Sequence, residues 1–345
     1  MKIRYGDAVA LATDLLAQVG LDQTKAAAVA RALGLAEAWN LGSHGLLRLP
    51  IYLDRLAAGG YGIDARLTPV TDLGALMVMD GETGLGHWQL SEAVNLAVPR
   101  AQKFGIAAVA VGNSGHCGAL GVYAADAAEA GMVSLVFSCG PAVLPPWGGT
   151  EKLLSTSPLA AGFPLTPRPA IIDMALTTVA RGKIAAYANR GEPLPDGWAL
   201  DATGQPTTDA QEALSGMLAP LGGAKGFALA FLVEALTAGL VGPQLSKNIP
   251  DFFDPHSLSQ PQQISHLLIL IDPRRADANG DPTAAADRFA ALAAATNTAG
   301  GRVPGTRKLA PSEVTPELLL DIDDALLQGL QTRQSQMVPT ARTSP

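Results

Sequence analysis

The residues with the clearest chemical potential lie near the N-terminus, where His44, Arg48 and Tyr52 follow one another at intervals of four. On a helix this spacing places an imidazole, a guanidinium and a phenol along one face. Arginine matches a carboxylate in two parallel hydrogen bonds, and histidine exchanges protons near neutral pH. The pattern therefore predicts a site for a 2-oxo or 2-hydroxy acid, on a helix that has Ser43 as its N-cap.

This polar stripe also has a structural interpretation. Side chains of these types at helical spacing commonly form a solvated face or an interface. Pro50 lies inside the segment, so a kink or a break in the helix is a further alternative.

Composition and charge exclude several classes of protein. The chain has 345 residues, of which 48% are hydrophobic and 16% charged. It can form a large core in two or three domains, or in one large domain with excursions. A net charge of −7 argues against a nucleic-acid partner. The only cysteines, Cys117 and Cys139, form no Cys-x-x-Cys motif, which fits a reduced compartment. No signal peptide or membrane-spanning segment is expected, so the predicted location is cytoplasmic.

The apolar periodicity predicts helices first and then an α/β core. Helices are expected at 5–19, 24–39, 90–104, 119–130, 227–240, 284–295 and 315–331, besides the helix that carries His44. Buried strands are expected at 75–79, 106–111, 133–138, 170–173 and 267–271, and an irregular excursion at 248–263. Residues 1–66 with 311–336 are assigned to a helical domain, 67–310 to the α/β core, and 337–345 to a disordered tail.

The glycine fingerprint of a Rossmann dinucleotide site is missing, and so is a P-loop. The segment 106–120 instead predicts a strand, a loop of small residues that displays His116, and the start of a helix. Free backbone N–H groups at a helix start can bind an anion. The alternative is a turn histidine that only caps the helix.

Two other loops are candidate phosphate sites. Glycines surround Lys225 in the segment 221–226, where the backbone can approach a ligand closely. The segment 300–308 carries Arg302, Arg307 and Lys308. The alternatives are a plain glycine turn and a solvated basic turn.

The five histidines show no spacing typical of a metal site, so no metal is expected. His266 begins an apolar strand and is interpreted as structural, whereas His87 and His256 stay unassigned. A serine hydrolase is excluded, because no Gly-x-Ser-x-Gly motif occurs and neighbouring side chains such as Ser43 and His44 diverge.

In their order and spacing, several short motifs resemble the malate/L-lactate dehydrogenase family that lacks a Rossmann fold. This family includes ureidoglycolate, sulfolactate and cyclic-imine (piperideine-2-carboxylate) enzymes, and the resemblance covers residues 5–331. The motifs are Ser43-His44-Gly45 with Arg48 and Tyr52, Asn113-Ser114-x-His116-x-Gly118, Pro146-Trp147-Gly148-Gly149, Ser155-Thr156-Ser157-Pro158, Asp173-Met174-Ala175, Ala180-Arg181-Gly182-Lys183, Gly223-Ala224-Lys225-Gly226 and Val303-Pro304-Gly305.

The resemblance implies an α/β fold with a non-Rossmann, mixed and mostly antiparallel sheet that binds NAD(P), and helical N- and C-terminal segments packed together. It also implies a homodimer with active sites between the subunits. The sequence does not distinguish NAD from NADP.

The resemblance also implies roles for individual residues. His116 matches the proton donor and acceptor of the ureidoglycolate branch, and His44, with Ser43, the proton donor of the imine-reducing branch. Substrate would be bound by Arg48, Tyr52, Thr156, Arg181 and Gly182. The cofactor would be bound by His116, Cys117, Gly118, Ala119, Leu120, Asp173, Met174, Ala175, Lys225, Val303, Pro304, Gly305, Thr306, Arg307 and Lys308.

Some positions depart from the family pattern. The imine-reducing branch has an acidic residue where this chain has Lys183, which weakens that assignment. Three further positions differ from the residue commonly found in the family. Ser157 stands in place of Asn, Thr306 in place of Glu, and Cys139 in place of Asn. The leading hypothesis is an NAD(P)-dependent oxidoreductase that interconverts a small 2-hydroxy acid and a 2-oxo acid of the malate, lactate or sulfolactate kind. The alternatives are an NADPH-dependent reductase of cyclic imine carboxylates and a non-catalytic NAD(P)-binding relative.

Overall fold

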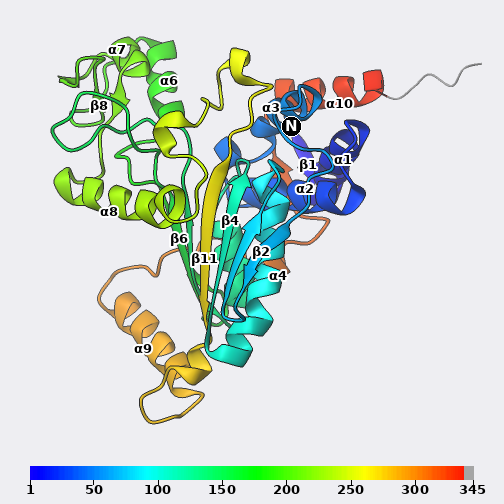
Figure 1. Ribbon diagram of the computed structural model, residues 1–345, viewed down its shortest axis with the longest axis vertical. Helices are drawn as coiled ribbons and strands as arrows, with labels where there is room; N and C mark the ends of the chain where they lie inside the picture. Colours follow the sequence, from blue (N-terminus) through cyan, green and yellow to red (C-terminus); the bar gives the residue numbers. More distant parts are fainter. Residues whose placement is uncertain (338–345) are drawn as a thin grey trace, which may run out of the picture.

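The computed structural model describes residues 1–337, which form a helical lobe, a central sheet and a smaller lobe (Figure 1). The tail that the sequence predicts to be disordered lies, from residue 338 onward, outside the described residues. No helix in the described part is long and apolar enough to cross a membrane.

The helical lobe joins the two ends of the chain. It contains α1 (Tyr5–Gln18), α2 (Gln23–Ala38), α3 (Leu49–Ala57) and α10 (Asp324–Met337), which bury a shared core of mostly leucine and alanine side chains. The carboxylate of Asp22 accepts hydrogen bonds from the amides of Thr24 and Lys25 and so caps α2. The first two predicted helices are confirmed to within one residue at each end.

The predicted helix at 315–331 is wrong in its first half. Leu319–Asp321 forms β12, which pairs antiparallel with β1 (Lys2–Arg4), and the helix begins only at Asp324. Pairing with a strand more than 300 residues away overrides the local pattern.

The central sheet has the order β2-β3-β4-β11-β5-β6-β7. Its strands are β2 (Thr68–Asp72), β3 (Leu76–Asp80), β4 (Ile106–Ser114), β11 (Ile264–Ile271), β5 (Val133–Ser138), β6 (Leu159–Phe163) and β7 (Ala170–Met174). Among the pairs in this sheet, β3 and β4 run parallel and the others antiparallel. The five predicted strands are present. The sequence analysis missed β2, which contains a proline, and β6, which is rich in small residues.

Two helices cover one face of the sheet. The side chains of Ala107, Val109 and Val111 on β4 are buried with residues of α4 (Gly86–Phe104) and α5 (Gly121–Glu129). The approach is close: a Cβ at Gly162 on β6 would lie 2.2 Å from the carbonyl oxygen of Ala124 on α5. Glycine is therefore required at that position.

The smaller lobe holds α6 (Arg181–Arg190), α7 (Ala210–Ser215) and a short sheet of β10 (Met217–Leu218), β8 (Ala199–Leu200) and β9 (Pro206–Thr207). Below it in Figure 1 lies α8 (Ala224–Glu234), which continues as a π-helix over Ala235–Gly239. The sequence analysis predicted one helix at 227–240 here and missed α6. Helix α9 (Ala284–Thr298) extends from the opposite end of the molecule (Figure 1).

Residues 249–262, here called the bridging segment, connect the two lobes. The irregular excursion predicted at 248–263 is confirmed. It contains a 3-10 turn at Pro255–Ser257, and another turn, Ser246–Asn248, ends at its first residue. The fully buried Arg55 of α3 donates to the carbonyl oxygen of Gln260 at 2.7 Å. The hydroxyl of Tyr61 donates to Oε1 of Gln262 at 2.6 Å. These buried contacts hold the segment against the helical lobe.

Candidate active site

His44, Arg48 and Tyr52 do not lie on one helix, so that prediction is wrong. Two 3-10 turns, Gly42–His44 and Leu46–Arg48, precede α3. The carboxylate of Glu37 accepts the amide of Leu46 at 2.6 Å, and the extended backbone at Gly45 separates the turns. Pro50 lies in the first turn of α3, where a proline is tolerated, and so kinks nothing.

Ser43 is also not the predicted N-cap. Its hydroxyl makes no capping hydrogen bond and lies instead 3.0 Å from Nδ1 of His44. Neighbouring side chains therefore do meet at this position, because the backbone forms a 3-10 turn and not the first turn of an α-helix. Ser43 can orient the His44 ring.

The structure nevertheless brings the sequence-predicted histidines together with Tyr52. The Tyr52 hydroxyl lies 2.7 Å from Nδ1 of His116, and the stacked rings of His44 and His116 have centroids 6.3 Å apart. Tyr52 is fully buried, whereas both imidazoles are partly accessible. His116 comes from the loop after β4, so the cluster forms where the central sheet meets the helical lobe.

The hydrogen bonds of His116 favour one neutral tautomer. The amide of Gly118 donates to Nδ1 at 3.3 Å, and an amide can only donate. Nδ1 then carries the lone pair, the Tyr52 hydroxyl donates to it as well, and the ring proton lies on Nε2. An Nε2–H group can donate to a substrate oxygen. Since a hydroxyl can also accept, Tyr52 can support the other tautomer when the proton moves.

Burial keeps the groups in this cluster uncharged. It lowers the pKa of His116 well below its usual value, and the neighbouring His87, His44 and Arg48 lower it further. Burial, followed by the charge of Arg48, also lowers the pKa of His44. Burial raises the pKa of Tyr52 well above its usual value. Neutral imidazoles beside a neutral phenol are the expected state near pH 7.

Protein contacts hold the Arg48 side chain in place without using all of its hydrogen-bond donors. Its Nε donates to the carbonyl oxygen of Ser43 at 2.7 Å, and its guanidinium lies 4.7 Å from the ring centre of Phe253. Among the described residues its terminal nitrogens have no hydrogen-bond partner. A fork of free N–H groups held over an aromatic ring suits an incoming carboxylate.

Three residues of the cluster were not singled out from the sequence. Phe252 of the bridging segment lies 4.8 Å from the His116 ring and 5.6 Å from that of Tyr52, and Phe253 covers Arg48. His87 at the start of α4 is fully buried, with its ring 4.9 Å from Tyr52. Within residues 1–337 neither ring nitrogen of His87 has a partner. The sequence pattern carries no signal for these contacts, since they join distant segments.

His266 is structural, as interpreted from the sequence. Its fully buried ring binds the hydroxyls of Ser138 at 2.9 Å and Ser114 at 3.0 Å, and burial lowers its pKa to about 4. In the part of the chain that the structure describes, no group of three or more His, Cys, Asp or Glu side chains is arranged to hold a metal ion.

The remaining substrate candidates lie on the side of the smaller lobe. Arg181 is the first residue of α6 and forms an ion pair with Asp251 at 3.0 Å, next to Phe252. Gly182 follows it on α6. The carbonyl oxygen of Thr156 accepts the amide of Leu176 at 2.9 Å. The roles of these three residues in binding substrate stay predictions.

The anion site predicted at the start of α5 is already filled by a side chain of the protein. The carboxylate of Asp173 accepts the amide of Gly121 at 3.0 Å. Burial raises the pKa of Asp173, and the charge of Lys308 partly offsets this. A phosphate at this helix start would meet a carboxylate, whereas hydroxyl groups could donate to it. The roles of His116, Cys117, Gly118, Ala119, Leu120, Asp173, Met174 and Ala175 in cofactor binding stay predictions.

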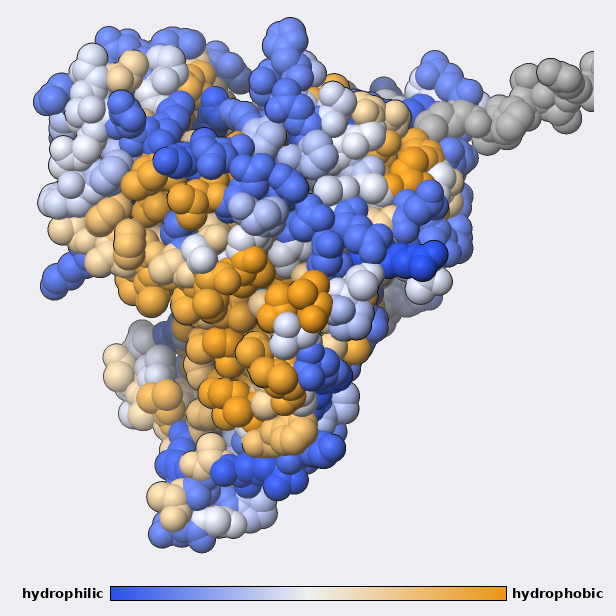
Figure 2. Space-filling model, in the orientation of Figure 1, coloured by the Kyte–Doolittle hydropathy of each residue, from blue (hydrophilic) through white to orange (hydrophobic). Residues whose placement is uncertain are grey.

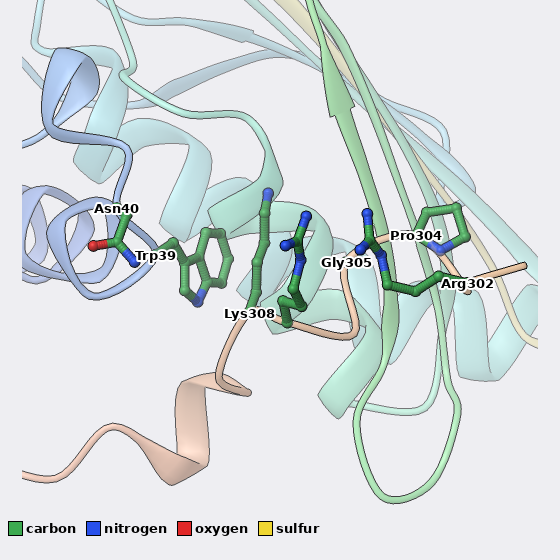
Figure 3. A pocket seen from close by; sticks show the side chains of 7 residues that line it. Trp39, Asn40, Arg302, Pro304, Gly305 and Lys308 are labelled. Atoms are coloured by element: carbon green, nitrogen blue, oxygen red, sulfur yellow. The ribbon is translucent and has the colours of Figure 1, made fainter.

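The basic loop near residue 305 lines a cavity of about 590 Å³. Figure 3 shows Lys308 beside Trp39 and Arg302 farther along the loop beside Pro304, with the charged ends of both side chains pointing the same way. The ammonium group of Lys308 lies 4.8 Å from the Trp39 ring centre. The complete lining consists of Trp39, Asn40, Arg302, Pro304, Gly305, Arg307 and Lys308. A cavity with three cations and an indole face fits the phosphate and the base of a nucleotide.

The glycine loop before α8 has the conformation that its sequence predicts. Gly222 and Gly223 adopt φ values of 64° and 71°. A Cβ at Gly226 would lie 1.8 Å from the carbonyl oxygen of Leu221, so only glycine fits. Lys225 is exposed at the start of α8, and its contact with a cofactor stays a prediction.

Comparison with known proteins gives consistent matches. A sequence profile of the malate/L-lactate dehydrogenase family matches residues 3–331. The chain is 38% identical over 333 residues to a (2R)-3-sulfolactate dehydrogenase (NADP(+)) of Chromohalobacter salexigens, which covers 95% of this chain and 97% of that protein. It is 32% identical to a Delta(1)-pyrroline-2-carboxylate reductase of Ancylobacter novellus, with coverage of 96% and 97%.

Solved structures share the fold. The delta1-piperideine-2-carboxylate reductase of Pseudomonas syringae pvar. tomato superposes with a TM-score of 0.87 at 28% sequence identity. The match covers 96% of this chain and 99% of that one.

Proposed function

We propose, since the chain belongs to the malate/L-lactate dehydrogenase family, that it reduces a small 2-oxo acid with His116 as the proton-exchanging residue. The general class predicted from the sequence, an NAD(P)-dependent oxidoreductase of 2-hydroxy acids, is confirmed by the relatives. The observation that carries the finer proposal is the contact of Tyr52 with His116 beside the free guanidinium of Arg48.

The chemistry follows from the positions of donors and acceptors. Arg48 binds the substrate carboxylate and thereby orients C2 toward the imidazoles. Nε2–H of His116 donates to the oxygen on C2 and stabilises the negative charge that develops there during reduction. His116 takes up one proton from solvent as it gives its Nε2 proton to this oxygen, so the ring ends as a neutral imidazole and the product carries a hydroxyl group. Oxidation runs through the same groups in reverse, with Nε2 accepting the proton.

The residues present fit a bound dinucleotide. The bound cofactor supplies the hydride that forms the new C2–H bond. Arg302, Arg307 and Lys308 would hold its phosphate groups, and the Asp173 carboxylate would accept hydrogen bonds from ribose hydroxyls. Three cations in one cavity support NADP over NAD, because a 2′-phosphate adds negative charge. We further propose that binding does not use a parallel Rossmann unit, since the glycine fingerprint is missing.

A second candidate is the reduction of a cyclic imine carboxylate. The hydrogen bond between Ser43 and His44 favours it, because it orients a second proton donor toward the cluster. Lys183 argues against it, because it replaces an acidic residue of that branch. Its exposed ammonium lies 4.7 Å from the ring centre of Trp198 in the smaller lobe.

We propose a homodimer formed through the open face of the sheet. Figure 2 shows a broad apolar surface that extends over the sheet. Leu76 on β3 and Ile106 on β4 are 39% and 47% exposed, and Phe231 on α8 is 58% exposed. An exposed apolar face fits a second copy of itself in an isologous interface.

We also propose a reduced, cytoplasmic location. Both cysteines are free and buried, and burial raises the pKa of Cys117 to about 12 and that of Cys139 to about 11, so neither is reactive. The proposed activity is tested by following NADPH consumption with a panel of 2-oxo acids.

A further inference from the structure

One carboxylate lies at the junction of the two 3-10 turns in the candidate site. Glu37 is the next-to-last residue of α2, and its Oε1 accepts the amide of Leu46 at 2.6 Å. This amide begins the second turn, Leu46–Arg48, and the preceding Gly45 has no side chain that could cap it. Glu37 therefore caps the turn from nine residues earlier in the chain.

The Glu37 carboxylate also packs on the backbone that joins the turns. A Cβ at Gly45 would lie 2.2 Å from Oε1 and 2.5 Å from Cδ of Glu37, and a Cβ at Gly42 would lie 3.4 Å from Oε2. The carboxylate thus occupies the space that a side chain at position 45 would need. Any larger residue there must displace the carboxylate and break its hydrogen bond to the Leu46 amide.

The end of α2 that carries Glu37 is itself fixed. The indole N–H of the buried Trp39 donates to the carbonyl oxygen of Leu309 at 2.8 Å. The amide of Leu41 donates to the carbonyl oxygen of Ala36 at 2.8 Å and closes the last turn of the helix. Glu37 is therefore held by the helix end and can act as a support for the turns.

The Arg48 side chain depends on both turns. Arg48 is the last residue of the second turn, and its amide donates to the carbonyl oxygen of Gly45 at 3.0 Å. Its Nε donates to the carbonyl oxygen of Ser43, which belongs to the first turn, at 2.7 Å. A shift of the junction at Gly45 would therefore move the guanidinium.

The Glu37 carboxylate has a single hydrogen-bond partner in the described part of the chain, the Leu46 amide. Burial raises the pKa of Glu37, and this hydrogen bond offsets the effect only in part. Because desolvation of a carboxylate costs free energy, the contact contributes local order more than stability.

We propose that Glu37 is a positioning residue for Arg48. Its carboxylate sets the turn Leu46–Arg48 and thereby the direction in which the guanidinium presents its free N–H groups. The inference rests on the proposed function, in which Arg48 binds the carboxylate of a 2-oxo acid, and deepens it. Two parallel hydrogen bonds to a carboxylate need a planar guanidinium at the correct place and angle, so a small displacement weakens them.

The test measures KM for pyruvate and oxaloacetate, and Kd for NADPH, in two variants of Glu37. Glu37→Ala should raise both KM values about tenfold or more while Kd for NADPH stays within about twofold of the wild type. Glu37→Gln keeps an oxygen that accepts the Leu46 amide, so its KM values should lie within about threefold of the wild type. A contact that matters only for folding would lower the active fraction, and so kcat, at an unchanged KM.

A double-variant cycle shows whether Glu37 acts through Arg48. In the Arg48→Lys background, Glu37→Ala should change KM by less than about twofold, because the planar guanidinium that it positions is no longer present. Equal losses from Glu37→Ala in the two backgrounds would overturn the proposal.

Glu129→Ala is the matched control. Glu129 ends α5, and its Oε1 accepts the amide of Ser312 at 3.0 Å, so it holds a loop from a helix end outside the candidate site. Its KM values should stay those of the wild type.

Gly45→Ala keeps the proposal testable if Glu37→Ala does not fold, because the added Cβ displaces the same carboxylate. A wild-type KM in Gly45→Ala then overturns the proposal. Wild-type turnover of 2-oxo acids with KM values that neither Glu37→Ala nor Gly45→Ala changes overturns the proposal but not the proposed function. A wild type that is silent on every 2-oxo acid overturns both.

Discussion

The hydroxyl oxygen of Tyr52 lies 2.7 Å from Nδ1 of His116, although the two residues come from a helix and a sheet loop 64 positions apart. The contact engages Nδ1 of the imidazole, and among the described residues no hydrogen bond is formed by Nε2. It also gives the ring a partner that can donate or accept as the proton moves. Tyr52 is thus a positioning residue for the proposed proton exchange.

Replacing Tyr52 with Phe should lower kcat for the reduction of a 2-oxo acid by about 100-fold with little change in KM, because the imidazole loses its orienting partner. Steady-state kinetics measures this. Tyr187→Phe is the control, since that ring packs 5.4 Å from the ring of Trp198 in the smaller lobe and, among the described residues, contacts no histidine. Equal losses of kcat in the two variants would show that Tyr52 does not act by positioning His116.

Arg48→Lys should raise KM for a 2-oxo acid by about 10- to 100-fold, which is roughly 1.4–3 kcal/mol, while thermal stability changes little. Lysine keeps the positive charge but loses the planar fork and the stacking on Phe253. Kinetics and a melting curve of the same preparation separate the two effects. Full catalytic efficiency in this variant would remove Arg48 from the mechanism.

Cofactor preference tests the basic cavity. Arg302→Ser and Arg307→Ser should each weaken NADPH binding about tenfold and NADH binding much less, because only NADPH carries the additional phosphate. Quenching of tryptophan fluorescence, to which Trp39 in the cavity contributes, gives both Kd values. Arg274→Ser, outside the cavity and paired with Asp272, is the control. Equal losses for the two cofactors would contradict recognition of a 2′-phosphate here.

Two buried histidines should make stability depend on pH. Burial lowers the pKa of His87 to about 3 and that of His266 to about 4, against an ordinary value of 6.5. Between pH 6.5 and 4 the unfolded chain binds protons that the folded protein does not, so the free energy of unfolding falls as the pH falls. From pH 7 to 5 the loss is roughly 2 kcal/mol for each ring.

Urea denaturation at several pH values measures this dependence. In the variant His266→Gln, the pH dependence of the free energy of unfolding should weaken by the contribution of one histidine. A free energy of unfolding that stays constant from pH 7 to 5 would show that these rings are not held neutral.

The apolar sheet face predicts the oligomeric state. Sedimentation velocity should show a dimer for the wild type and a monomer for the double variant Leu76→Lys, Ile106→Lys, since two charges would be buried without partners. Leu319→Lys, at an exposed apolar position of the helical lobe, is the control. A double variant that stays dimeric would place the interface elsewhere.

Local signals predicted much of the fold but less of the candidate site. The helix at 24–39 and the strand at 133–138 depend on patterns of neighbouring residues, and both were predicted closely. Local patterns failed where a contact with a distant residue determines the secondary structure. Glu37 turns the segment after α2 into 3-10 turns, and β1 converts 319–321 into a strand.

The candidate site, too, could be predicted only in part from the sequence. His44, Arg48, Tyr52 and His116 could be singled out by type and spacing, although the helix proposed to align them does not exist. Phe252 could not be found in this way, because it reaches His116 from a segment 136 residues away in the sequence. Its contact depends on the buried anchors at Arg55 and Tyr61.

The most direct test follows the oxidation of NADPH and NADH by absorbance with pyruvate, 2-oxobutyrate, 2-oxoglutarate, oxaloacetate, 3-sulfopyruvate and piperideine-2-carboxylate, for the wild type and for His116→Asn. We expect NADPH oxidation with a linear 2-oxo acid that the substitution lowers by at least 100-fold. Turnover of the imine alone, or full activity without His116, would contradict the account.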